Sequence, residues 1–214
     1  MKDLLEIQHA SKWLRKAKVL DDISVTLESG KIYGLQGING SGKTMLLRLM
    51  AGLIYADIGW VRWNGKALGQ GLDFPEGTGL FLEKPSFLDR YTGKQNLELL
   101  GGLKGVSDDE LERTLKDVGL WEARDKKYRK YSLGMKQRLG IGAALLGGPR
   151  LLLLDEPLNA IDQESVDHFQ KLFLRERDRG AIVVLVSHDA ALLDSTCDRK
   201  YLMEGGRIRL ETEK

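Results

Sequence analysis

Cysteine is nearly absent from this sequence, because Cys197 is the only one among 214 residues. A lone cysteine cannot form an internal disulfide, and it excludes a zinc site built from several cysteines. Long apolar runs are missing as well, since none approaches the roughly 18 residues that a membrane-spanning helix requires. Residues 1–6 carry acids where a secretory signal would have its apolar core, so we expect no export signal and a cytoplasmic protein.

A large excess of either charge is also lacking, since 33 basic residues stand against 31 acidic ones and the net charge is +2. This balance gives no field that would argue for a nucleic-acid partner, and none is expected. The basic run at 124–130 is more typical of a solvated surface than of a nucleic-acid patch. The length, with 42% hydrophobic and 30% charged residues, fits one large domain or a domain with a small insertion.

The stretch from Gly37 to Thr44 reads Gly-Ile-Asn-Gly-Ser-Gly-Lys-Thr and fits the phosphate-loop pattern G-x-x-x-x-G-K-[ST]. A strand pattern at 31–36 precedes it and a helical pattern at 45–50 follows it, which is the context that this motif requires. Glycines let the backbone turn tightly and point its N–H groups at phosphate oxygens, and the helix adds its positive end. The pattern predicts that nucleotide phosphates bind at Gly37, Asn39, Gly40, Ser41, Gly42, Lys43 and Thr44.

The last two residues of this motif carry its side-chain chemistry. The Lys43 ammonium is expected to reach the β- and γ-phosphates, and the Thr44 hydroxyl to join the shell of a Mg²⁺ ion. The alternative is an ordinary glycine-rich turn before a helix, which the Lys-Thr pair and the preceding strand disfavour.

Strand and helix patterns alternate along most of the chain. Antiparallel strands are predicted at 5–9 and 25–27, with a hairpin at Asn64-Gly65. Buried strands are predicted at 79–83, 151–154 and 181–186. Helices are predicted at 92–103, 107–118, 134–146 and 162–179.

These patterns predict an α/β fold in which ligands bind at the carboxyl ends of the strands. We expect a P-loop NTPase core with a mainly parallel sheet, an antiparallel N-terminal β subdomain and a helical insertion. The predicted unit is a single domain over 1–214, with the helical subdomain at about 84–146.

Two buried strands end on residues with titratable side chains. Asp155-Glu156 follows the leucine run at 151–154, and Ser187-His188 follows 181–186. Two acids after such a run are also what a strand that simply reaches solvent would show. The phosphate loop in the same chain favours a functional interpretation.

These motifs, in this order, make the chain resemble the ATP-binding subunits of ABC transporters over nearly its whole length. The segment 131–139, Tyr-Ser-Leu-Gly-Met-Lys-Gln-Arg-Leu, is most similar to bacterial drug and bacteriocin-resistance exporters of the bacitracin-export type. The resemblance implies ATP and Mg²⁺ as cofactors. It implies that Asp155 holds the metal, that Glu156 orients the attacking water, and that His188 contacts the γ-phosphate beside Lys43.

The resemblance also implies that two copies face each other, as a homodimer or as a heterodimer with a second ABC ATPase subunit. Ser132 and Gly134, at the start of the signature helix, would then serve the partner's ATP. The segment 159–162 would cross the dimer interface as the D-loop.

Three departures from the family pattern stand out. The usual Gly-Gly pair of the signature is Leu133-Gly134, with Met135 where glutamine is common. The adenine-stacking position falls on Leu14, while Trp13 is one residue away; either Trp13 meets the base or it packs in the core. The expected glutamine at the Q-loop is Glu83, which the resemblance makes a candidate Mg²⁺ ligand.

We therefore expect a Mg-dependent ATPase whose nucleotide-driven dimerisation powers a separate membrane permease, and the subfamily resemblance favours export. The protein would lie on the inner face of the cell membrane, held there by that permease. One alternative is an ABC ATPase of soluble machinery, against which the absence of coiled-coil insertions and of a second cassette argues. The other is a nucleotide-gated binding module with negligible turnover, against which Glu156 and His188 argue.

Overall fold

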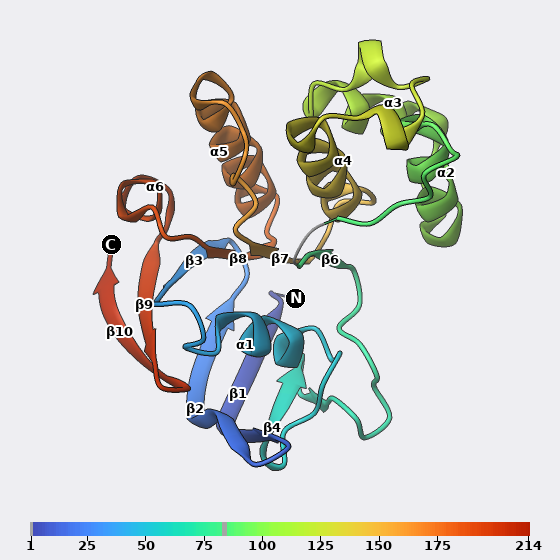
Figure 1. Cartoon of the computed structure of the whole chain (residues 1–214). Helices are drawn as coiled ribbons and strands as arrows, with labels where there is room; N and C mark the ends of the chain where they lie inside the picture. Colours follow the sequence, from blue (N-terminus) through green and yellow to red (C-terminus); the bar gives the residue numbers. More distant parts are fainter. Residues whose placement is uncertain (1, 83–84) are drawn as a thin grey trace.

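The computed structural model describes residues 2–82 and 85–214 (Figure 1). An antiparallel sheet comes first, with strands in the order β2-β1-β4-β5. Its members are β1 (Leu4–Leu14), β2 (Ala17–Glu28), β4 (Ile58–Trp63) and β5 (Lys66–Ala67). Asn64 and Gly65 between β4 and β5 have φ of 51° and 80°, as the favoured two-residue hairpin turn requires.

This sheet and its hairpin agree with the sequence prediction, but β1 and β2 are longer than the predicted spans 5–9 and 25–27. The reason is that cross-strand pairing continues both strands beyond the predicted spans, with Ala10, Leu20 and Ile23 fully buried along the extension. Antiparallel pairing holds the two strands together as far as Leu14 and Ala17, although the register shifts along the way.

The second sheet has the order β10-β9-β3-β8-β7-β6 in the described part of the chain. The pairs β6–β7, β7–β8, β8–β3 and β3–β9 are parallel, whereas β9 and β10 pair in antiparallel fashion. Its members are β3 (Lys31–Gln36), β6 (Thr78–Phe81), β7 (Leu151–Asp155), β8 (Ile182–Val186), β9 (Arg199–Glu204) and β10 (Arg207–Glu213).

The parallel sheet separates two hydrophobic clusters. Leu151 and Leu153 pack with helix α1 (Lys43–Met50) and with the antiparallel sheet, whereas Leu152 and Leu154 pack with the helices of the opposite face. Both faces of β7 are covered, which explains why its sequence is an uninterrupted apolar run. The mixed α/β fold that the sequence predicts, with one antiparallel and one mainly parallel sheet, is confirmed.

The remaining helices begin after residues whose side chains accept a hydrogen bond from a backbone N–H in the first turn. These capping residues are Thr92, Ser107, Ser132, Asp162 and Asp189. Such caps fix where a helix begins, because the first backbone N–H groups have no partner within the helix. The helices are α2 (Gly93–Lys104), α3 (Asp108–Asp117), α4 (Leu133–Leu145), α5 (Gln163–Asp178) and α6 (Ala190–Thr196), with two short 3₁₀ turns at Trp121–Ala123 and Tyr128–Lys130.

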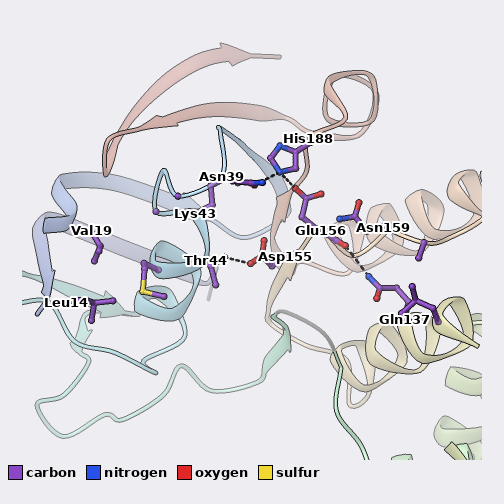
Figure 2. Close-up of a pocket in the computed structure, with 15 residues that line it drawn as sticks. Leu14, Val19, Asn39, Lys43, Thr44, Gln137, Asp155, Glu156, Asn159 and His188 are labelled. Carbon is purple, nitrogen blue, oxygen red and sulfur yellow. Dashed lines mark hydrogen bonds and ion pairs between the residues drawn. The ribbon is translucent and has the colours of Figure 1, made fainter. Parts of the chain in front are cut away.

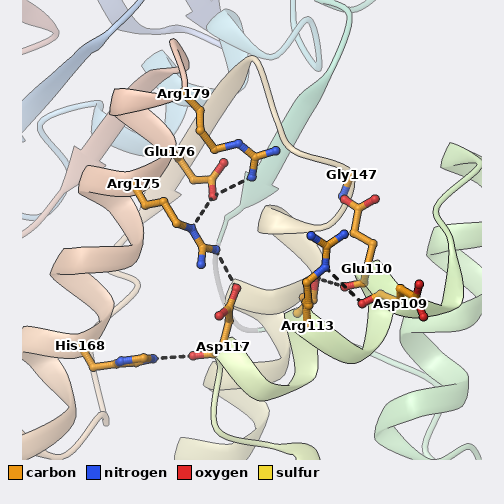
Figure 3. Close-up of polar contacts among 10 residues, drawn as sticks. Asp109, Glu110, Arg113, Asp117, Gly147, His168, Arg175, Glu176 and Arg179 are labelled. Carbon is orange, nitrogen blue, oxygen red and sulfur yellow. Dashed lines mark hydrogen bonds and ion pairs between the residues drawn. The ribbon is translucent and has the colours of Figure 1, made fainter.

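Helices α2, α3 and α4 form a group of their own beside the parallel sheet, at the upper right of Figure 1. This group packs on the sheet through α4, where Gly140 lies so close to Phe81 that an added Cβ would stand 2.5 Å from the ring. A second contact joins α3 to α5, since Asp117 meets both His168 and Arg175 (Figure 3). Among the described residues, no helix has the length and apolar character to cross a membrane.

Candidate functional site

The loop between β3 and α1 is held in a conformation that only glycine tolerates well. Gly40 and Gly42 have φ of 81° and 109°, which places both in the left-handed region. At Gly42 an added Cβ would lie 2.7 Å from Met203 Cε and 2.7 Å from the carbonyl oxygen of Val19. Backbone conformation therefore requires glycine at both positions, and close packing requires it at Gly42 as well.

Lys43, the first residue of α1, turns its side chain back into this loop. Its Nζ donates to the carbonyl oxygens of Gly37 at 2.7 Å and Ile38 at 2.9 Å. Burial lowers the pKa of Lys43, and the nearby carboxylates of Glu156 and Asp155 oppose that shift. The ammonium is thus poised inside the loop beside two acids.

Thr44 and Asp155 bring the phosphate loop and the end of β7 together. Thr44 Oγ1 donates to Asp155 Oδ2 at 2.5 Å, across 111 positions of sequence. A hydroxyl and a carboxylate are the oxygen ligands that Mg²⁺ prefers when it keeps waters and nucleotide phosphates as its other ligands. The donor set therefore fits a Mg²⁺ ion.

Beyond Asp155, three polar side chains from separate loops meet (Figure 2). His188 Nε2 lies 3.0 Å from Glu156 Oε1 and 3.1 Å from Asn39 Oδ1. Burial raises the pKa of Glu156, while His188 acts in the opposite direction. Glu156 is therefore a carboxylate of raised basicity beside the phosphate loop.

A cavity of about 640 Å³ opens between these groups. Figure 2 shows Leu14 and Val19 at one end of it, the phosphate loop in the middle, and Glu156 with Gln137 at the other end. One end is apolar and the other is polar, which suits a ligand with a flat apolar base and an anionic tail. Its lining residues are Leu14, Val19, Asn39, Gly40, Gly42, Lys43, Thr44, Met45, Leu133, Gln137, Asp155, Glu156, Asn159, Ala160 and His188.

Two residues of the predicted phosphate-binding set, Gly37 and Ser41, belong to the loop but do not line this cavity. Ser41 is buried, and its Oγ has no hydrogen-bond partner among the described residues. Glu83, the candidate metal ligand, lies outside the described residues.

The structure places Leu14, and not Trp13, on the cavity wall. Adjacent residues of a strand point to opposite faces, so only one of the two can face the cavity. The Trp13 ring instead lies beside Lys18, whose Nζ is 5.0 Å from the ring centroid. Trp13 is 36% exposed, so it does not pack in the core, and its stacking on adenine stays a prediction.

Ser132 and Gly134 lie at the start of α4, outside the set that lines the cavity of their own chain. Ser132 is exposed and caps α4 by accepting from Met135 N at 3.3 Å. Gly134 lies against the D-loop segment, since an added Cβ would stand 3.1 Å from the carbonyl oxygen of Ala160. Leu133 between them is 60% exposed and borders the cavity.

Sequence reasoning missed Gln137, which borders the cavity from α4 and donates to the carbonyl oxygens of Glu156 and Pro157. A signal for it was available, because Gln137 lies on the same helical face as the apolar residues Ile141 and Ala144. A polar side chain on such a face needs specific partners.

The comparisons with known proteins agree with this geometry. The family model for the ABC transporter matches residues 20–159. This chain belongs to the ABC transporter family. Within that family it is an ATP-binding subunit, and the resemblance drawn from the motifs is confirmed.

Individual ABC relatives match nearly the full chain. The uncharacterized ABC transporter ATP-binding protein YybJ of Bacillus subtilis (strain 168) is 41% identical over 96% of this chain and 94% of its own length. The bacitracin transport ATP-binding protein BcrA of Enterococcus faecalis is 33% identical over 97% of this chain and 68% of its own. A solved ATP-binding subunit of an ABC transporter has a TM-score of 0.89, with 26% identity over 98% of this chain and 90% of that one.

Proposed function

We propose that this chain is a Mg-dependent ATPase whose nucleotide-driven pairing with a second ATPase subunit works a membrane permease, in the direction of export. The observation that carries the hydrolytic part is the contact of Thr44 with Asp155, 2.5 Å long, at the cavity that Lys43 and Glu156 also line. We propose further that residues 1–214 form one ABC ATPase domain with a helical subdomain at about 84–146.

In this proposal each side chain has one task. Lys43 exchanges its two carbonyl contacts for phosphate oxygens, which its buried ammonium attracts strongly. Glu156 accepts a hydrogen bond from the attacking water and orients it, and its raised pKa suits a general base. His188, already 3.0 Å from Glu156, donates toward the γ-phosphate.

Thr44 and Asp155 would hold the metal, with Glu83 as a further ligand. When bound, Mg²⁺ neutralises charge on the β- and γ-phosphates. Without it, Asp155 and Glu156 would repel the triphosphate across the same cavity. We therefore expect turnover to depend on the metal.

The proposed second subunit completes the site. Ser132 is exposed and caps α4, and Gly134, which has no side chain, lies in its first turn, where backbone N–H groups favour an anion. They do not line the cavity of their own chain, which supports a role at the partner's ATP. The segment 159–162 would lie at the interface between the two subunits.

The permease is proposed as a separate polypeptide, which would hold this subunit on the cytoplasmic face of the membrane. Support comes from the family and from BcrA, whose name assigns it to bacitracin transport. The direction of transport rests on that similarity together with the segment 131–139.

A steady-state ATPase assay on purified protein tests the proposal. We expect hydrolysis that requires Mg²⁺ and stops in excess chelator. Glu156→Gln should bind ATP about as tightly as the wild type and lose a factor of about 10² to 10⁴ in turnover. Full turnover by Glu156→Gln would refute the catalytic assignment, whereas ATP binding with no turnover by the wild type, alone or with its permease, would favour a nucleotide-gated binding module.

A further inference from the structure

Gln137 is a polar residue on the buried face of α4. Its exposed fraction is 8%, and Ile141 and Ala144, one and two helical turns further on, are fully buried. A buried amide on such a face is tolerated only if its hydrogen-bonding groups find partners. The partners of Gln137 therefore indicate what this residue does.

Both partners belong to the turn that follows β7. Gln137 Nε2 donates to the carbonyl oxygen of Glu156 at 3.2 Å (Figure 2). It also donates to the carbonyl oxygen of Pro157 at 3.0 Å. Only the amide nitrogen can donate to two carbonyls, so the orientation of the amide group is fixed by its partners. The side chain thus binds two successive peptide groups directly after the strand.

Glu156 has an unusual backbone conformation, with φ of 51°. A residue with a long side chain keeps a left-handed conformation only where its surroundings impose it. On the N-terminal side, Glu156 N donates to the carbonyl oxygen of Val186 at 3.1 Å. On the C-terminal side, Gln137 holds the carbonyl groups of Glu156 and Pro157.

We propose that Gln137 is a positioning residue that fixes the direction in which the Glu156 side chain leaves its strained turn. That direction brings Glu156 Oε1 to 3.0 Å from His188 Nε2, at the wall of the cavity. The inference rests on the proposed function, because it matters only if Glu156 orients the attacking water. Gln137 itself contributes no proton, and its amide group makes the two hydrogen bonds that hold the turn.

The test uses Gln137→Met, which keeps the length of the side chain and removes the donor. We expect turnover to fall about 10-fold to 100-fold, since small misplacements of a catalytic group have effects of this size. The dissociation constant for ATP should stay within about twofold, because Lys43 and the phosphate loop are untouched. Gln137→Asn, which keeps the amide group but shortens its reach, should lower turnover in the same direction and serves if Gln137→Met folds poorly.

Gln170→Met is the matched control. Gln170 also makes two hydrogen bonds through Nε2, to Ser195 Oγ and Thr196 Oγ1 at 3.0 Å each, on α5 and away from the cavity. It should keep wild-type turnover. An equal loss of turnover in both variants would overturn the inference, because the effect would then be one of general stability.

A double-mutant cycle separates positioning from an independent role. In the Glu156→Gln background, Gln137→Met should change the residual rate by less than about twofold, since the group that it positions is already lost. An unreduced effect in that background would overturn the inference. The inference would also be overturned if Gln137→Met kept wild-type turnover while Glu156→Gln was inactive. That result would leave the proposed function intact. Full turnover by Glu156→Gln would overturn the proposed function and this inference with it.

Discussion

Arg175 of α5 and Asp117 of α3 form an ion pair, with 2.7 Å between Nη2 and Oδ2 (Figure 3). The same α5 helix reaches the last turn of α3 a second time, since His168 Nε2 donates to the carbonyl oxygen of Asp117 at 2.6 Å. Arg175 also contacts Glu176, which is 2% exposed, at 3.3 Å. An ion pair between two side chains and a hydrogen bond from a third side chain to a backbone carbonyl therefore link the helical group to the core.

We predict that Asp117→Asn lowers the stability by about 0.5–1 kcal/mol, because the pair is partly exposed and exposed pairs contribute little. This corresponds to a melting temperature about 1–4 °C lower in a chain of this size. Glu112→Gln on the same helix is the control, since Lys116 and Glu112 pair within α3 alone. Equal shifts for the two variants in thermal unfolding would show that the contact with α5 adds nothing.

Local patterns predict most of this fold. The strands at 151–154 and 181–186 are recognisable because sheets covered on both faces need continuous apolar runs, and the caps Thr92, Ser107 and Ser132 mark helix starts. The extension of β1 and β2 is not predictable in the same way, because cross-strand pairing rather than apolar alternation decides it. Tertiary contacts override local preference there.

The residues of the site likewise divide into those that local sequence predicts and those that only tertiary packing brings together. The phosphate loop is a local motif, so its glycines, Lys43 and Thr44 follow from sequence. The choice between Trp13 and Leu14 depends on which face of β1 meets the loop, and a slip of one residue reverses it. The contact of Gln137 with the turn after β7 joins segments far apart in sequence, and only the packing of α4 on the sheet brings them together.

We predict that Leu14 and not Trp13 contributes to ATP binding. Leu14→Ala should weaken binding about 3-fold to 10-fold, because a buried aliphatic side chain against a base contributes about 1 kcal/mol. Trp13→Ala should change the affinity less than twofold. Isothermal titration with ATP in excess Mg²⁺ measures both, and a larger loss for Trp13→Ala would restore the stacking role to Trp13.

The pH dependence of turnover should report Glu156. Burial raises its pKa and His188 opposes that shift, so His188→Ala should raise the pKa of Glu156 further. A general base works only when deprotonated, so activity is lost as the pH falls through this pKa. We therefore expect the acid limb of the turnover profile to move to higher pH in His188→Ala.

The remote histidine provides the control for this profile. His168 contacts the Asp117 carbonyl and lies outside the cavity lining, so His168→Ala should leave the acid limb in place. An acid limb that moves to lower pH in His188→Ala, or one that moves equally in both variants, would contradict the assignment of the limb to Glu156.

The last prediction concerns sites shared between two subunits. If Ser132 serves the partner's ATP, a mixture of Lys43→Ala and Ser132→Arg chains forms heterodimers with one doubly defective site and one intact site. Random pairing would restore about a quarter of the sites, because half of the dimers are mixed and each has one intact site. Each variant alone should be inactive, so the turnover that appears on mixing measures how many sites the mixture has restored.

Lys43→Ala mixed with Glu156→Gln is the control. These two residues line one cavity, so every site in that mixture keeps a defect and no turnover should return. If the first mixture shows no rescue under conditions where the chains pair, Ser132 serves the ATP of its own chain. Rescue in the control would instead show that Lys43 and Glu156 do not act at one site.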